Sequence, residues 1–289
     1  MKKQVLLAGV MGASVLLAAC GGDDGGVANA GSSTSNSNDA GAPTAPSPGV
    51  SQPSVQAACR PNGRFTYSGS ASQVAANNGQ LAVLVVPSLP TAYQKNRNIT
   101  APNAPASSQV QQASGAFTTL ASSAAATDCL GLDHGAVTEI QSVGSDVAIG
   151  RWNQAMDTDG NTYSSDQGIH YAVGRPLSLS LSATSGTLAC TQLIADTVAS
   201  ADGGQGGTLG ASSATLDLGT RTLNNLSLSI NWANTQSTLT NTQAPLNGAS
   251  TTGQLSVQTV VVGHDTAQPL VAVGYSTQSI GGVVVLSCR

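Results

Sequence analysis

The chain has very few charged residues and no basic cluster. Only 8% of its 289 residues are Asp, Glu, Lys or Arg, and Glu139 is the only glutamate. Apart from Lys2 and Lys3, eight Lys and Arg residues stand against fourteen acidic ones. Nucleic acids and anionic lipid surfaces are bound through clustered Lys and Arg, so we expect no nucleic-acid partner and no electrostatic docking to a membrane.

Aromatic residues and strong helix formers are scarce as well. Two Trp, five Tyr and two Phe are the only aromatic residues, and most of the polarity comes from Ser, Thr, Asn and Gln. A shortage of Glu and Lys disfavours long helices, and this composition is typical of exported proteins rich in strands.

Signatures of common catalytic and metal sites are missing. There is no Gly-x-Ser-x-Gly motif, and the glycine-rich segment 203–207 lacks the Lys-Ser/Thr of a phosphate-binding loop. A single glutamate does not favour glycosidase chemistry. We therefore expect no catalytic residue, no metal site and no cofactor. The alternative is a hydrolase in which His134, His170 or His264 meets a serine and an aspartate in space.

The first twenty residues have the pattern of an export signal. Lys2 and Lys3 precede the apolar stretch Val5–Ala19, which is too short to span a bilayer permanently. Leu17-Ala18-Ala19-Cys20 ends this stretch and resembles the lipobox of bacterial lipoproteins.

That resemblance implies a lipid anchor. Residues 1–19 are then a signal peptide, and Cys20 becomes the first residue of the mature protein, with palmitate-like acyl chains that hold it to a membrane. Gly21 follows the cysteine where an aspartate would favour the inner membrane. We expect an outer-membrane protein, on the periplasmic face or at the cell surface.

Residues 20–58 are expected to be a disordered tether. They are mostly Gly, Ser, Asn, Ala, Asp and Pro, which cannot bury enough apolar area to offset the entropy lost on ordering. Prolines in the second half of this segment favour an extended chain that holds the folded part away from the membrane.

Four cysteines follow the tether: Cys59, Cys129, Cys190 and Cys288. An even number in an exported chain predicts two disulfides, and three pairings are open. We favour Cys59 with Cys129 and Cys190 with Cys288, because each bridge then stays within one half of the chain. No two of these cysteines are close enough in sequence to form a zinc-ribbon ligand pair.

Apolar and polar residues alternate along much of the remaining chain. Leu226, Leu228, Ile230 and Trp232 alternate with polar residues, which predicts a strand with Trp232 on its core face. Similar strands are expected at Leu177–Leu181, Leu216–Leu218, Phe65–Ser70, Leu81–Val86, Ala136–Gln141, Asp146–Asn153, Ile169–Val173, Leu188–Ala195, Leu255–Val262, Leu270–Ser276 and Gly282–Ser287. Only residues 104–128 favour a helical turn or two.

These patterns predict an all-β, antiparallel protein. We expect a strand-rich N-terminal region at residues 59–145 and an up-and-down barrel of about eight strands at residues 146–289. Four segments carry a further resemblance: Ala148-Ile149-Gly150-Arg151-Trp152, Gly168-Ile169-His170-Tyr171-Ala172-Val173-Gly174, Leu193-Ile194-Ala195-Asp196-Thr197 and Ala214-Thr215-Leu216-Asp217-Leu218-Gly219. They resemble successive strands of the eight-stranded barrel of transferrin-binding protein B and related lipoproteins. The resemblance implies the fold and leaves the ligand open.

One loop stands out as a candidate binding site. Asp157, Asp159 and Asn161 place oxygen atoms at alternate positions, as a calcium loop begins, but Gly160 comes early for such a loop and favours a hairpin turn. Tyr163 is expected to be an exposed anchor in the same loop.

The expected function is a non-enzymatic binding or surface-interaction module whose partner is a protein or a small molecule. Three polar segments are candidate contact loops: Gln154–Gln167, Ala201–Thr208 and Ala233–Thr252.

Overall fold

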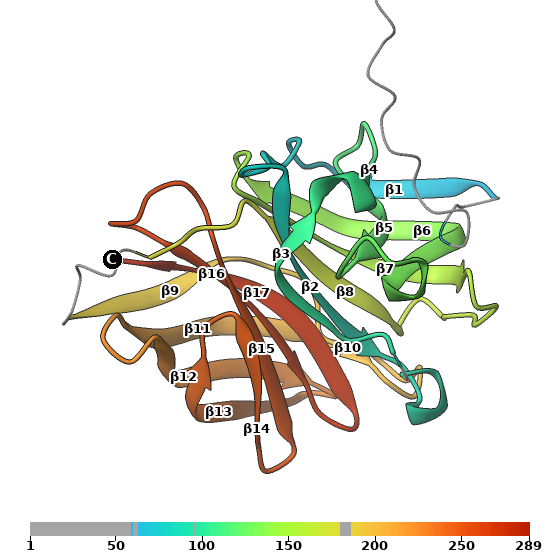
Figure 1. Cartoon of the computed structure of the whole chain (residues 1–289). Coiled ribbons are helices and arrows are strands. Elements are labelled where there is room, and N and C mark those ends of the chain that lie inside the picture. The colour runs from blue at the N-terminus through green and yellow to red at the C-terminus, as the bar shows by residue number, and fades with distance from the viewer. Residues whose placement is uncertain (1–58, 60–62, 95, 180–185) are drawn as a thin grey trace, which may run out of the picture. The chain divides into compact units, whose positions relative to one another are not determined.

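Two β-sheets make up most of the part of the chain that the structure describes (Figure 1). This computed structural model describes residue 59 and residues 63–94, 96–179 and 186–289, which belong to one structural unit. The predicted signal peptide and tether, including Cys20, lie outside these residues. Within the described ranges, the helices are the short 3-10 turns Thr91–Tyr93, Ala106–Ser108 and Ala126–Asp128. The all-β prediction is therefore confirmed. No helix among the described residues is long and apolar enough to cross a bilayer.

The first sheet is coloured blue to yellow-green in Figure 1. Its strands are β1 (Phe65–Gly69), β2 (Gln80–Ser88), β3 (Ile99–Pro105), β4 (Val110–Gln111), β5 (Phe117–Ala121), β6 (Cys129–Val143), β7 (Val147–Asp157) and β8 (Gly168–Gly174). They are ordered β3-β2-β8-β7-β6-β5-β4 with antiparallel neighbours, and β1 joins β6 in parallel. Residues 104–128, where helical turns were expected, contain two 3-10 turns at Ala106–Ser108 and Ala126–Asp128 and the short strands β4 and β5.

The second sheet, yellow to red in Figure 1, curls into a nearly closed barrel. Its strands are β9 (Thr187–Ala195), β10 (Ala199–Ser200), β11 (Thr208–Asp217), β12 (Thr222–Trp232), β13 (Thr235–Pro245), β14 (Gly248–Thr252), β15 (Leu255–Val262), β16 (Leu270–Ser276) and β17 (Ile280–Cys288). The order β13-β12-β11-β9-β17-β16-β15-β14 is that of an eight-stranded up-and-down barrel, with β10 added beside β17.

Side chains close the barrel between its two outermost strands. Asn241 on β13 donates from its Nδ2 to the hydroxyls of Ser250 (3.3 Å) and Thr252 (3.1 Å) on β14. These two described strands do not pair through a backbone ladder. The barrel therefore has one seam held by side chains instead of by a backbone ladder.

The change from one sheet to the other lies between β8 and β9. The boundary expected at residues 145 and 146 falls in the turn between β6 and β7, and these two strands pair with each other. Accordingly, two of the four segments that resemble a transferrin-binding barrel lie in β7 and β8 of the first sheet, and the other two lie in or at the ends of β9 and β11. The barrel itself begins at Thr187.

Three apolar clusters explain the strand sequences. One fills the concave side of the first sheet, a second fills the barrel, and a third lies between the two sheets. On β2, Leu81 and Val83 belong to the first cluster, whereas Leu84 and Val86 belong to the third. Because successive side chains point to opposite faces, a strand between two cores must be apolar throughout. This accounts for the unbroken run at residues 81–86.

Alternation predicted β12 correctly. On β12, Leu226, Leu228 and Ile230 are fully buried in the barrel, as expected, while Trp232 at its end is only partly buried. The strand expected at Leu177–Leu181 is wrong for its described part, because residues 177–179 lie in the irregular connection that follows β8. Leu181 lies outside the described residues.

Candidate functional site

The apolar interface between the sheets ends in a buried polar group. Ser88 shares a face of β2 with Leu84 and Val86, and His170 shares a face of β8 with Ala172. The Ser88 hydroxyl lies 3.0 Å from Nε2 of His170. Both residues are almost completely buried, with 2% and 0% of their surfaces exposed.

The barrel supplies the third member of this group. Asp196, which directly follows β9, places Oδ2 2.5 Å from Nδ1 of His170. Its other carboxylate oxygen accepts a hydrogen bond of 2.8 Å from the backbone N–H of Val283 on β17. Burial raises the pKa of the Asp196 carboxyl, and His170 acts in the opposite direction. The Ser88–His170–Asp196 group thus links strands of both sheets.

A second polar bridge starts at the next residue. The backbone N–H and the hydroxyl of Thr197 donate to Glu139 on β6, at 2.6 and 2.7 Å. Arg151 on β7 donates to the same carboxylate at 2.7 Å and to the carbonyls of Ser165 and Gln167. Burial alone would raise the pKa of Glu139, but Arg151 and Thr197 bring it below its ordinary value. Residues 196 and 197 therefore clamp the barrel to the first sheet.

The first bridge has the connectivity of a serine-hydrolase triad. A hydroxyl faces one imidazole nitrogen and a carboxylate faces the other, at distances that allow proton transfer. A reacting carbonyl carbon must also approach the hydroxyl to about 3 Å. Here the backbone of β17 covers it, since a Cβ built on Gly281 would lie 2.5 Å from Ser88 Oγ. In this conformation, the group connects the sheets and has no room for a substrate.

A buried phenol lies beside the triad. Tyr275 on β16 is fully buried, and its hydroxyl has no hydrogen-bond partner among the described residues. A Cβ built on Gly282 would lie 2.4 Å from this hydroxyl and 3.1 Å from Oδ1 of Asp196, so glycine is needed there. Burial, followed by the charges of Asp196 and Glu139, raises the pKa of Tyr275 well above its ordinary value.

The expected binding loop after β7 is held by internal contacts. Asp157 is 1% exposed, pairs with Arg97 at 2.6 Å, and accepts a hydrogen bond from the hydroxyl of Tyr163. Asn161 donates to it from its backbone N–H at 3.0 Å. Burial opposes ionisation of Asp157, but these donors bring its pKa below the ordinary value. Asp159 is exposed and also contacts Arg97 at 3.0 Å.

Tyr163 is a core residue. The expectation that it is an exposed anchor is wrong, because only 5% of its surface is exposed and it packs within the core of the first sheet. The alternation that predicts strand faces does not extend into an irregular loop, so the loop sequence gave no indication of this burial.

The other two histidines lie apart from this group and near the surface. His134 lies beside Asp133 at 2.9 Å, and His264 lies 2.7 Å from Asp146. No set of three metal-binding side chains occurs among the described residues. His170 is thus the histidine that the fold brings together with both a serine and an aspartate.

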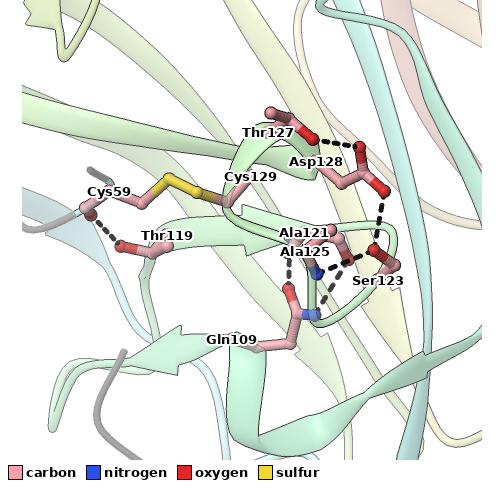
Figure 2. The surroundings of a disulfide bond; sticks show 9 residues. All are labelled: Cys59, Gln109, Thr119, Ala121, Ser123, Ala125, Thr127, Asp128 and Cys129. Atoms are coloured by element: carbon pink, nitrogen blue, oxygen red, sulfur yellow. Dashed lines mark hydrogen bonds between the residues drawn. A yellow bond between two sulfur atoms is a disulfide. The ribbon is translucent and has the colours of Figure 1, made fainter. Parts of the chain in front are cut away.

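The disulfides have the expected pairing. Cys190 on β9 and Cys288 on β17 are directly opposite each other in adjacent strands of the barrel. Figure 2 shows the other bridge, which joins Cys59 to Cys129 at the start of β6. The hydroxyl of Thr119 donates to the carbonyl of Cys59 at 2.9 Å, so β5 also fixes residue 59.

Two of the three candidate contact loops meet in space. The backbone N–H of Ser200 donates to the carbonyl of Asp166 at 2.8 Å, and the side chain of Gln167 donates to the carbonyl of Ala201 at 3.1 Å. Residues 154–167 and 201–208 thus form one surface with contributions from both sheets, which we call the composite loop face. Residues 233–252, expected to be a third loop, mostly form strands β13 and β14.

Comparisons of the chain with protein-family models, curated proteins and solved structures found no match.

Proposed function

We propose that this protein is a lipid-anchored component of the bacterial outer membrane whose folded part acts as a non-enzymatic interaction module. The observation that carries this proposal is the composite loop face. Its loops come from different sheets and are held together by backbone and side-chain hydrogen bonds. Loops on a rigid scaffold are where proteins commonly place binding residues.

The clamp at Asp196 and Thr197 supports the same proposal. Buried hydrogen bonds to His170 and Glu139 join the two sheets close to these loops. A surface shared by two sheets keeps its shape only if the sheets do not move against each other, so the clamp preorganises the face for a partner. The expected membrane anchor at Cys20 and the expected likeness to lipoproteins of the transferrin-binding type fit this arrangement.

Capture of partners from envelope extracts and host fluid tests the proposal. Ser164 and Gln205 are exposed residues of the composite loop face, and Thr266 and Gln268 are exposed residues of the β15–β16 loop. We expect a protein or small-molecule partner that the native chain and the control T266R/Q268R retain and that S164R/Q205R loses. Retention by S164R/Q205R, or the absence of any partner in either source, would contradict the proposal.

The triad geometry favours a second candidate function, a hydrolase that opens at the contact between the sheets. A fluorophosphonate probe, which reacts with activated serines, distinguishes it. Labelling that is lost in Ser88→Ala and kept in Ser164→Ala would favour the hydrolase, together with turnover of ester surrogates that depends on His170. The interaction proposal expects Ser88 to stay unlabelled while the protein is folded.

A further inference from the structure

Strand β13 leaves one edge of the barrel sheet open. It pairs with β12 along one side, and no described strand pairs with it along the other. Near its end, Nδ2 of Asn241 donates to the hydroxyl of Thr252, the last residue of β14. Residues 235–240 extend past that contact, and all of them except Leu239 are exposed. The first half of β13 is therefore an edge that no described residue covers.

The hairpin between β12 and β13 determines which backbone groups lie on this edge. Residues 233–234 form its two-residue turn, and both have positive φ, 50° and 61°, as a type I′ turn requires. In such a hairpin the flanking residues, Trp232 and Thr235, exchange both backbone hydrogen bonds, and bonded pairs then alternate along the ladder. The N–H and C=O groups that point away from β12 are therefore those of Gln236, Thr238 and Thr240.

Proteins usually protect an open edge with proline, with charge or by keeping the edge strand short. Both edges of the first sheet have such protection, since β3 carries Pro102 and Pro105 and β4 has only two residues. Residues 235–240 contain no proline and no charged residue. Three of them are threonine, which favours strands. This edge is thus suited to pairing with a further strand.

The charge distribution favours a second copy of the chain as the source of that strand. Apart from Lys2 and Lys3, eight Lys and Arg residues stand against fourteen acidic ones, so copies of the chain repel each other through their net charge. Between Arg221 and Asp265, however, the sequence contains no charged residue, and this stretch includes β12 to β15. Two copies that meet along β13 therefore bring no like charges into contact.

We propose that two copies of the chain form a dimer through antiparallel pairing of β13 with β13. A closed two-fold dimer uses the same surface on both subunits. Thr238 lies at the axis, where its N–H and C=O bond to the same groups of the second copy, and Gln236 of each copy faces Thr240 of the other. This interface is separate from the composite loop face and does not rest on the proposed function.

Sedimentation equilibrium of the full chain carrying Cys20→Ser, which leaves no acyl chain on residue 20, tests the proposal. We expect a reversible monomer–dimer equilibrium without larger species, because pairing uses the open edge of both copies. A chain that stays monomeric up to millimolar concentration would overturn the proposal. So would a monomer whose amides at residues 236, 238 and 240 are protected from hydrogen exchange, since another segment of the same chain would then cover the edge.

Substitutions at Thr238 locate the contact. Its N–H points away from β12, so Thr238→Pro removes no ladder bond within the chain and is expected to fold. It should weaken dimerisation by at least about tenfold, whereas the control Thr238→Val, which keeps the N–H and a branched side chain, should dimerise like the native chain. Native-like dimerisation by a folded Thr238→Pro variant would refute the proposal.

Charged variants test the two-fold arrangement. Thr238→Lys and Thr238→Glu each place like charges opposite one another at the axis, so each variant alone should dimerise about threefold more weakly at low ionic strength. A mixture of the two should form a mixed dimer, because opposite charges then face each other. A mixture that dimerises no better than the separate variants would contradict pairing at Thr238.

Discussion

Replacing His170 with leucine is expected to destabilise the protein by about 3 kcal/mol, because it leaves two buried hydrogen-bonding groups, Asp196 and Ser88, without their shared partner. The substitution leaves the Asp196 carboxylate, which is completely buried, with the backbone N–H of Val283 as its remaining described hydrogen-bond donor. It also removes the partner of the Ser88 hydroxyl. Leucine is similar in volume to histidine, so little of the cost should come from an empty cavity.

The second substitution Asp196→Asn should restore part of this loss. The amide keeps an oxygen for the N–H of Val283 and carries no charge, so H170L/D196N is expected to be about 2 kcal/mol more stable than H170L alone. Burial raises the pKa of Asp196 in the fold above its ordinary value. A raised pKa of an acidic group contributes stability at low pH that is lost as the pH rises. The difference in unfolding free energy between H170L and H170L/D196N should therefore shrink as the pH is lowered.

Urea unfolding at neutral pH with intact disulfides measures these differences. Trp152 is buried in the first sheet and Trp232 lies at the end of β12 in the barrel, so variants with one tryptophan report on each sheet separately. In the native background, the unfolding transitions reported by Trp152 and Trp232 should coincide. If the clamp couples the two sheets, these two transitions should occur at different urea concentrations in H170L. A cost below about 1 kcal/mol for H170L, or a double variant less stable than H170L, would refute the reasoning.

Further predictions concern packing, acid stability, the disulfide and the anchor. Gly274→Ala should cost about 1–3 kcal/mol in thermal unfolding, because the added Cβ would lie 2.4 Å from Val86 across the sheet interface. The pKa of Asp157 is lowered, so its ionised form contributes stability above about pH 4, and this contribution is lost as the pH falls below that value. In urea unfolding, the difference in unfolding free energy between the native chain and Asp157→Asn should therefore become smaller below about pH 4. C190A/C288A opens a loop of 98 residues and should lower stability by up to about 4–5 kcal/mol. Metabolic labelling with palmitate should mark the native chain and not Cys20→Ser.

Several strands could be predicted from the sequence because one of their faces is buried and the other is polar. Alternation located β9, β12, β15, β16 and β17 to within a few residues, but it missed β13 and β14, which were expected to be a loop. The sheet boundary could not be predicted, because β7 and β8 resemble barrel strands and the hairpin turn at residues 144–146 looks like any other. Which sheet a strand joins depends on its contacts with strands elsewhere in the chain, and the sequence of the strand alone does not show these contacts.

The polar clamp was predictable only in part. His170 was one of three histidines considered for the alternative hydrolase, whereas Glu139 was noted only as the single glutamate and was not expected to form a site. Ser88 and Asp196 lie 82 and 26 residues from His170 and look like any serine and aspartate in the chain. Alternation shows that Ser88 shares a face with Val86, but it does not show that β17 covers that face. The role of Arg97 as the partner of Asp157 was missed for the same reason.

The place of β17 in the barrel has a consequence for how the protein reaches its native state. This strand is the last of the ring in chain order, yet it sits between β9 and β16. Until β17 pairs with them, β9 and β16 each have one edge with unpaired backbone groups. Closing the barrel therefore requires a pairing between strands about a hundred residues apart in the chain. Assembly should be slow, and a chain shortened before β17 should stick to other chains through those edges.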